Sequence, residues 1–305
     1  MAINSLTMED RYAPPSLEVV SLRFEQFGFP LVQDDTIIPD DDTTLFVCSG
    51  MQRVRKRFLT PDGSRHGSLQ SCVRTNDLEL VGDGSHLTYF QMLGNFHFGG
   101  SYEASAELWH SILLDFQIPV DSVHCHPDRP DHQLLWRKLG YEIQDDLECV
   151  WSDGEIGGHC CEIYSRGLEI GNLVNTLDHS VDVGFGWERL IQVNENVSRV
   201  DETYLFGRFH PIVSDHSRTL ELFWRHGITP GNKHRNYVCR RLIRRMLPYL
   251  EDHKFVFQDW VDSEKEQLRR RLLDAKKLWK RHKNQSPEWW WSTCGILPEE
   301  IRSLQ

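Results

Sequence analysis

Residues 180–193 read SVDVGFGWERLIQV, which is an apolar strand pattern with one acidic residue and two glycines, followed by an arginine in the first turn of an amphipathic helix. Gly184 and Gly186 lack a Cβ, so the backbone there can approach a flat ligand closely. Arg189 is planar and permanently charged, which suits a phosphate or carboxylate, and Asp182 offers the opposite charge. The stretch fits a site for a charged ligand, and it equally fits a glycine-kinked strand that runs into a surface helix. The neighbouring sequence has to decide between them.

The composition indicates a globular chain without a membrane partner. Its 305 residues are 39% hydrophobic and 26% charged, enough to form the core of one large domain or two. No apolar run approaches the roughly 20 residues that cross a bilayer, and the first twelve residues lack the pattern of a signal peptide. Eight cysteines without a framework spacing indicate reduced thiols, mostly in the core. We therefore expect a cytoplasmic protein.

The net charge of −11 argues against a chain coated with nucleic-acid-binding charge, although it permits a local basic stripe.

Up to about residue 200 the pattern predicts an α+β domain, in which strands with antiparallel signals pack against helices. Two of the strands, on either side of a polar loop, suggest a hairpin. The expected strands are 45–48, 71–74, 86–93, 148–151, 162–164, 168–177 and 181–183, and the expected helices are 17–29, 103–116 and one that begins near Pro130.

Residues 201–305 predict a small α-helical second domain. Helical periodicity covers 205–225, 235–250, 261–282 and 299–304. Three consecutive tryptophans, 289–291, would form a stacking platform if exposed, but packing between the last helices is the favoured interpretation.

Two further arginine-bearing segments suggest phosphate chemistry. Arg74 ends one hairpin strand and Phe90 lies on the other, so a guanidinium could clamp a phosphate while an aromatic ring stacks on a base. The segment YVCRRLIRRM places Arg240, Arg241, Arg244 and Arg245 at helical spacing. Taken singly, Arg74 fits equally well as an ion-pair partner, and the arginines of the second segment fit equally well as a solvated helix face. Phe90 alone fits better as a core aromatic residue.

Taken together, the segments resemble the catalytic core of the alanyl-tRNA synthetases, a family of class II aminoacyl-tRNA synthetases. The resemblance runs from about Pro30 to the C-terminus and lacks the editing and dimerising regions of the family. The sequence is therefore interpreted as a freestanding core, and it does not indicate the number of subunits. The motifs that carry the resemblance are, in order, CSGMQ, CVR, NDLELVG, YFQMLGNFHFGG, CCEIY, GNLV, SVDVGFGWERL, SDHSR, GNKHRNYVCRRLIRRM and STCGILPEEI.

The resemblance implies an antiparallel sheet that holds ATP, flanked by helices and followed by a helical domain that meets the tRNA acceptor stem. In this sequence Arg74 matches the arginine on the α-phosphate, and Phe90 matches the aromatic residue beside the adenine. Arg189 matches the arginine at the γ-phosphate. Met92, near the adenine edge, and Gly186 complete the expected ATP site. We expect Arg74 and Arg189 to be the catalytic residues, with ATP and Mg²⁺ bound.

The same resemblance implies an alanine site. Asp182 matches the aspartate that pairs with the substrate ammonium, and Asn172 matches an asparagine near the amino acid. Trp151 and Val174 match the walls of a pocket sized for a methyl group, and Gly184 is also expected to bind the amino acid. Glu169 is the carboxylate that we expect to hold the metal.

Several positions depart from the family pattern. The loop after CVR is several residues shorter, Gly171 stands where the family has a tryptophan, and Gln91 replaces a glutamate. His159 replaces a proline. Each of these changes is expected to touch the pocket or its rim.

Two positions concern the acceptor. Asn232 matches the asparagine that reads the acceptor stem, whereas Ser292 stands where the family has an aspartate. We therefore expect activation of alanine and its transfer to a non-tRNA acceptor, either a small molecule such as a nucleoside or a carrier. One alternative is a minimal synthetase that charges tRNA through Asn232, Arg240, Arg241 and Arg244. The other is a non-catalytic paralogue that binds RNA or a synthetase.

Two stretches contain candidate zinc ligands. HCHPDRPDH spans residues 124–132 and HCC spans residues 159–161. Neither has a paired CxxC spacing or a partner at a fixed distance, so the sequence does not favour a metal there.

Overall fold

The computed structural model describes residues 15–41, 43–176, 179–251 and 253–304. Leu177, the expected end of one strand, and the N-terminal twelve residues lie outside this part. By contacts the chain divides into two compact units. Unit 1 comprises the residues up to Arg74 together with Asp83–Leu205, and unit 2 comprises Thr75–Gly82 and the residues from Phe206 onward. The sequence places the division at 200/201 and assigns Thr75–Gly82 to the first domain.

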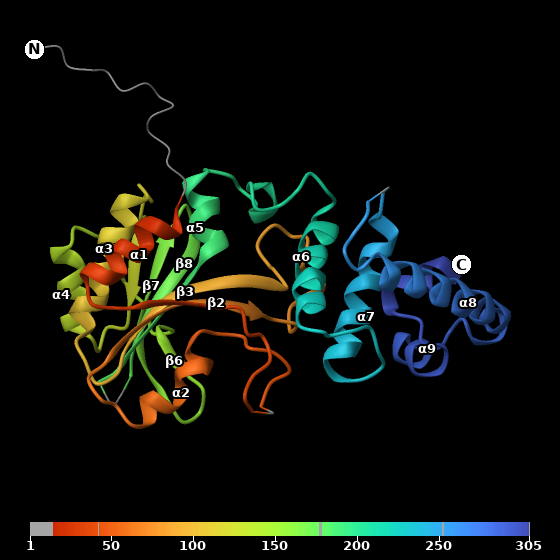
Figure 1. Ribbon diagram of the computed structural model, residues 1–305, viewed down its shortest axis with the longest axis horizontal. Helices are drawn as coiled ribbons and strands as arrows, with labels where there is room; N and C mark the ends of the chain where they lie inside the picture. The colour runs from red at the N-terminus through yellow and green to blue at the C-terminus, as the bar shows by residue number, and fades with distance from the viewer. Residues whose placement is uncertain (1–14, 42, 177–178, 252, 305) are drawn as a thin grey trace, which may run out of the picture. The chain divides into compact units, whose positions relative to one another are not determined.

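Unit 1 is built on one mixed sheet, which has nine strands in the described part of the chain (Figure 1). Its order is β1-β2-β3-β9-β8-β7-β4-β5, and β6 pairs with β7. Only β1–β2 and β4–β5 pair in parallel; the other described pairs are antiparallel. The predicted α+β class with an antiparallel sheet is confirmed. The strands are β1 (Leu31–Asp34), β2 (Arg65–Val73), β3 (Tyr89–His97), β4 (Ser122–Cys125), β5 (Ile143–Asp145), β6 (Val150–Ser152), β7 (Gly157–Ser165), β8 (Leu168–Thr176) and β9 (Val181–Gly186).

Helices cover one face of this sheet. Side chains alternate between faces along a strand, so Val181, Val183 and Phe185 of β9 enter the main core while the residues between them face the other way. Phe185 stacks on Trp109 of α3 with ring centroids 3.6 Å apart. Figure 1 shows α1 and α3 on this side of the sheet and α2 on the other. The helices are α1 (Leu17–Gln26), α2 (Met51–Leu59), α3 (Tyr102–Asp115), α4 (Pro130–Lys138) and α5 (Trp187–Asn194).

Helix α1 shows how local sequence sets these boundaries. The Ser16 side chain accepts the amide hydrogen of Val19 at 3.3 Å and caps the first turn. Gly28, with φ of +74°, follows the last turn in a conformation that other residues rarely adopt. The sequence extends this helix to 29, but the glycine ends it earlier.

One predicted strand is wrong. Residues 45–46 form a bend and residues 47–48 belong to no helix or strand. The Val47 amide donates to the Ile37 carbonyl at 2.9 Å, and its own carbonyl accepts from Val73. These single hydrogen bonds hold an extended loop without making a ladder. Helix α2, which follows directly, is not predicted because no side chain caps its start and charged residues fill it.

Unit 2 is helical, as predicted. Residues 299–304 belong to a 3₁₀ helix, Pro298–Leu304, and α9 lies outside the predicted segments. Trp290 is fully buried in a cluster with Ala275, Ile296 and Leu304, so this tryptophan serves packing. In the described part of the chain, no helix is long and apolar enough to cross a membrane. The α-helices are α6 (Pro211–Arg225), α7 (His234–Met246), α8 (Gln258–His282) and α9 (Pro287–Cys294), with 3₁₀ turns at Leu78–Leu80 and Leu247–Tyr249.

Candidate functional site

Strand register gathers the predicted site residues of unit 1 on the sheet face opposite the main core. Residues paired across neighbouring strands point to the same side. Asp182 pairs with Val174 on one side and Phe96 on the other, and Asn172 pairs with Gly184. We call this surface the polar face; its rows are Phe96–Asp182–Val174–Cys160, Gly94–Gly184–Asn172–Glu162 and Met92–Gly186.

Asp182 is a half-buried carboxylate without an internal partner. Among the described residues it makes no hydrogen bond and no ion pair. Desolvation raises the pKa of its carboxyl to about 7. Because a buried charge without a partner is costly, a ligand cation at this position would be favourable.

The walls beside Asp182 are apolar and compact. Val174 packs with Cys149 and Cys160, and Trp151 packs against this group. Trp151 also lies against a second cluster that contains Phe96 and Met51. An indole and an isopropyl group near a carboxylate are side chains that suit a small amino acid.

The glycines on this face allow close approach of strands and side chains. A Cβ at Gly184 would lie 3.1 Å from the sulfur of Met92, which therefore lies against this glycine. A Cβ at Gly94 would overlap the Val183 carbonyl oxygen, so the pairing of β3 with β9 requires a glycine there. The Gly50 amide is 3.4 Å from the same sulfur of Met92. Gly186 lies next to the Arg189 side chain: a Cβ added to this glycine would be 3.4 Å from Cδ of Arg189.

Arg74 and Phe90 form a pair near the end of the β2–β3 hairpin. The Arg74 guanidinium carbon lies 4.9 Å from the centre of the Phe90 ring, and its Nε donates to the Cys48 carbonyl at 3.1 Å. Its two Nη groups make no hydrogen bond to a described residue. An exposed guanidinium with free Nη donors beside an aromatic face can bind a phosphate next to a base.

Arg189 and Glu169 lie together at the start of α5. Arg189 Nη1 donates to the Glu169 carbonyl at 2.6 Å and lies 3.6 Å from its carboxylate. The arginine remains about two-fifths exposed, so it can still meet an anion. The predicted metal ligand thus already has a cationic neighbour.

Two contributions to the site are not predicted from the sequence. Glu188 is buried and accepts the amide hydrogen of Gln91 at 3.0 Å, which joins α5 to β3. Glu162 accepts the hydroxyl hydrogen of Tyr164 at 3.0 Å, and burial together with Glu169 raises the pKa of Glu162. The charged residue within the apolar segment GFGWERL was the available signal for Glu188.

Gly171 does not lie on the face that carries Asp182 and Asn172, although the sequence analysis expects it to touch the amino-acid pocket or its rim. It pairs with Phe185 and therefore lies on the core face, opposite Asn172. A Cβ at this position would overlap the Phe185 ring, which Trp109 covers. The aromatic bulk of this region thus comes from neighbouring elements.

The acceptor-facing candidates of unit 2 are paired internally. Arg240 Nε donates to Glu264 at 2.7 Å, and its Nη1 donates to the Asn232 side chain. Arg241 pairs with Glu79 of the Thr75–Gly82 loop, as does Arg245.

For Arg244 the structure corrects the prediction of an acceptor-facing residue. The side chain is 1% exposed, and Nε donates to Glu300 at 2.8 Å. Nη1 donates to the Gly295 carbonyl at 2.8 Å. This arginine holds the helices of unit 2 together and does not face solvent.

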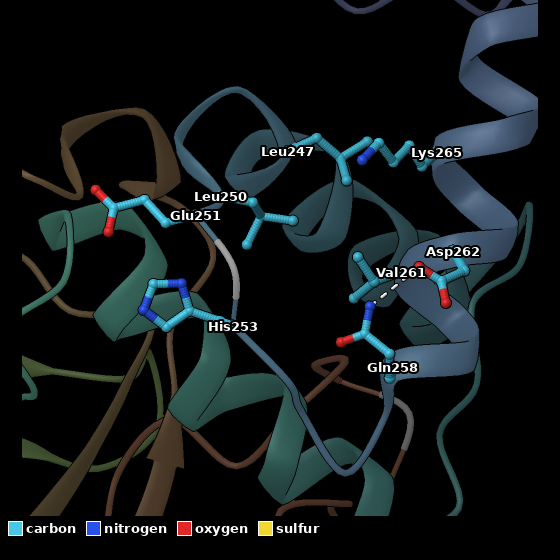
Figure 2. Close-up of a pocket in the computed structure, with 8 residues that line it drawn as sticks. All are labelled: Leu247, Leu250, Glu251, His253, Gln258, Val261, Asp262 and Lys265. Atoms are coloured by element: carbon cyan, nitrogen blue, oxygen red, sulfur yellow. Dashed lines mark hydrogen bonds between the residues drawn. The ribbon is translucent and has the colours of Figure 1, made fainter.

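Two pockets of about 410 Å³ lie outside the predicted site residues. Figure 2 shows the one in unit 2, where the Gln258 amide donates to Asp262 at 3.0 Å. The other, in unit 1, lies at the start of α3. The unit 2 pocket is lined by Leu247, Leu250, Glu251, His253, Gln258, Val261, Asp262 and Lys265.

The comparisons with known proteins agree with the resemblance found in the sequence. A family model described as tRNA synthetases class II (A) matches residues 23–183 and 167–271. The alanine–tRNA ligase of Desulfitobacterium hafniense (strain Y51) is 30% identical over 74% of this chain and 34% of that protein. That of Synechococcus sp. (strain JA-2-3B'a(2-13)) is 31% identical over 73% and 33%. That of Thermobifida fusca (strain YX) is 28% identical over 84% and 38%.

The chain spans about a third of the length of the curated relatives it matches. Among solved structures, a pyrrolysyl-tRNA synthetase from Desulfitobacterium hafniense is 15% identical, with a TM-score of 0.38 over 65% of this chain and 75% of that chain. This value is too low to support an argument. The family match, in contrast, covers most of the chain, and the protein belongs to the class II (A) tRNA synthetases, with a region that resembles the catalytic core of alanine–tRNA ligases.

Proposed function

We propose that this chain is an ATP-dependent ligase that activates alanine as alanyl-adenylate and transfers the alanyl group to a non-tRNA acceptor. That acceptor is a small molecule, such as a nucleoside, or a carrier. The observation that carries the first half is Asp182, a half-buried carboxylate without an internal partner, in register with Val174 on the polar face. Family membership and the names of the relatives support the same chemistry.

In the first step the alanine carboxylate attacks the α-phosphorus of ATP, and the bond to pyrophosphate breaks. No general base is required, because an amino-acid carboxyl with a pKa of about 3.5 is already ionised. Asp182 holds the ammonium, and the free Nη donors of Arg74 bind the α-phosphate. Arg189 offsets charge on the leaving pyrophosphate. Catalysis by this set is positioning and charge compensation.

Magnesium fits the carboxylate chemistry of this face. Glu169 would hold it, because hard divalent cations prefer oxygen ligands. The ion would offset phosphate charge, and Arg189 would exchange its contact with Glu169 for one with the nucleotide.

In the second step a nucleophile on the acceptor attacks the alanyl carbonyl carbon and AMP leaves. The internal ion pairs of α7 support an acceptor other than tRNA, since three of its arginines already have a glutamate partner. The pairs are Arg240 with Glu264, Arg241 with Glu79 and Arg244 with Glu300. Transfer to tRNA is the second candidate. The names of the relatives favour it, and so does the presence of Asn232.

Alanine-dependent exchange of pyrophosphate into ATP tests the activation step. We expect exchange with alanine, and we expect Asp182→Asn to lower kcat/KM for alanine by about 10²–10³-fold, because one partner of a buried charge pair is lost. Asp259→Asn, an exposed position on α8, serves as the matched control and should leave exchange unchanged. Absence of exchange with any amino acid would support the non-catalytic paralogue instead.

The acceptor is tested separately with labelled alanine, ATP and total tRNA. We expect little labelled alanine in acid-precipitable tRNA. We expect AMP to be released only when a competent small acceptor or carrier is added. Robust charging of tRNA would overturn the proposed acceptor and leave the activation step intact.

A further inference from the structure

The fold brings together the two histidine-rich stretches that are far apart in the sequence. His126 and Asp128 follow β4, and His159 lies in β7. The imidazole centroids of His126 and His159 are 4.3 Å apart, and His126 Nδ1 is 3.8 Å from the Asp128 carboxylate. One ligand atom from each of the three residues lies within 4.8 Å of the others.

The surroundings of this cluster favour a cation. Arg129, a positive charge that acts on His159, donates to Asp131 at 2.7 Å and to the Asn175 side chain at 2.8 Å, so its charge is compensated. His126 is buried, whereas the Asp128 carboxylate is 77% exposed, which gives an ion a path from solvent.

We propose that His126, His159 and Asp128 form a site for a divalent transition metal of the zinc type. Two imidazole nitrogens and one carboxylate oxygen are a donor set that such ions accept, and three protein ligands leave a position for water. Metal at His126 Nδ1 replaces the 3.2 Å hydrogen bond that this atom accepts from the Asp128 amide.

A metal here would connect the loop after β4 to the start of β7. His159 directly precedes Cys160, which packs against Val174 on the polar face. His159 pairs with Asn175 and lies on the other side of the sheet from Asp182. The site would therefore tie β7 to the loop after β4, on the other side of the sheet from the proposed alanine pocket, and it goes beyond the adenylation chemistry.

A second group, Cys149, Cys160 and Glu162, is also compact enough for an ion. Both cysteines are buried in apolar packing with Val174 and Trp151. Contact with Cys160 and burial raise the pKa of the Cys149 thiol well above its ordinary value, which disfavours the thiolate that a metal requires. The histidine cluster is the stronger candidate.

The test is equilibrium binding of Zn²⁺ to the full chain, together with the absorption spectrum of the Co²⁺-substituted protein. We expect one ion per chain, a Co²⁺ spectrum of nitrogen and oxygen ligands, and a higher melting temperature with Zn²⁺. Loss of second-shell groups alone costs about 10–100-fold in metal affinity, so His159→Gln and Asp128→Asn should each cost at least about 100-fold. Asp128 is exposed, so its variant should fold normally.

The matched control is His124→Gln, two residues from His126 and paired across the strands with Glu162, so it points to the polar face. It should keep the affinity of the unmodified chain. No stoichiometric Zn²⁺ binding, equal loss in His124→Gln, or a thiolate-to-cobalt absorption band that disappears in Cys149→Ser would each overturn the proposal.

Discussion

Unit 1 has arginines near the polar face and unit 2 has arginines on helix α7. They look alike in the sequence, but they differ in whether the fold supplies a partner of opposite charge. Arg74 keeps two Nη groups without a partner among the described residues, and Asp182 on the same face has no cation. On α7, Arg240, Arg241 and Arg244 each have a glutamate. A charge that the fold leaves uncompensated indicates a ligand site, whereas a compensated charge indicates architecture.

The largest effect should come from removing an arginine that has a buried glutamate partner, and it should appear in the free energy of unfolding. Arg244→Ala removes the arginine of a buried ion pair with Glu300, and losing one member of such a pair costs about 3–5 kcal/mol of unfolding free energy. Denaturant unfolding followed by tryptophan fluorescence measures the loss. Arg241→Ala is the control, because Glu79 is mostly exposed and an exposed pair contributes at most about 1 kcal/mol. Equal small losses in both variants would contradict the structural role of Arg244.

The uncompensated side predicts a loss of activity with little loss of stability. Arg189→Ala should lower kcat/KM for pyrophosphate exchange by about 10²–10³-fold, the usual effect of removing one donor to a developing negative charge. Arg189→Lys should recover part of this, since it keeps the charge and loses the planar fork. Arg225→Ala, on the surface of α6, should leave exchange unchanged. Full activity of Arg189→Ala would remove this arginine from the site.

A smaller effect concerns the pH dependence of stability. Burial raises the pKa of Asp182 to about 7 from an ordinary 3.8, so the folded state favours its protonated form. The contribution of Asp182 to the free energy of unfolding is therefore fully present below its ordinary pKa of 3.8, and it is lost as the pH rises through about 7. Asp182→Asn cannot ionise, and it should be more stable than the unmodified chain at pH about 8 by about 1–3 kcal/mol, with little difference at pH about 4.

Melting curves of both proteins over this pH range measure the effect. The sign matters, because the same substitution is expected to remove activity. A variant that is less stable at high pH would mean that Asp182 has a compensating partner in the free protein, and it would weaken its assignment to the substrate ammonium.

The sequence predicts well where local pattern and packing agree. Helix 103–116 and the strand at 168–177 are found close to their expected bounds, since each is long enough to show a clear helical or strand period. The strands at 31–34, 122–125 and 143–145 are missed, because three or four residues carry too little periodicity.

The sequence predicts which residue types the candidate site contains, but it does not predict which residues they contact in the fold. Gly171 shows the limit: sequence comparison places it in the pocket, but strand register turns it to the core face under Phe185. Arg244 shows it again, because helical spacing cannot reveal that Glu300, 56 positions later, lies against it. Both errors arise from contacts between residues that are distant in sequence or on neighbouring strands.

The loop Thr75–Gly82 has a consequence for how this protein could evolve or be divided. Because the loop belongs to unit 2, the chain passes between the units at three peptide bonds, 74/75, 82/83 and 205/206. A shortened protein that ends at 205 would keep the loop but lose the partners that bury Leu78 and Val81. The helical unit therefore cannot be exchanged between proteins as a simple C-terminal cassette, and recombination would have to carry the hairpin loop with it.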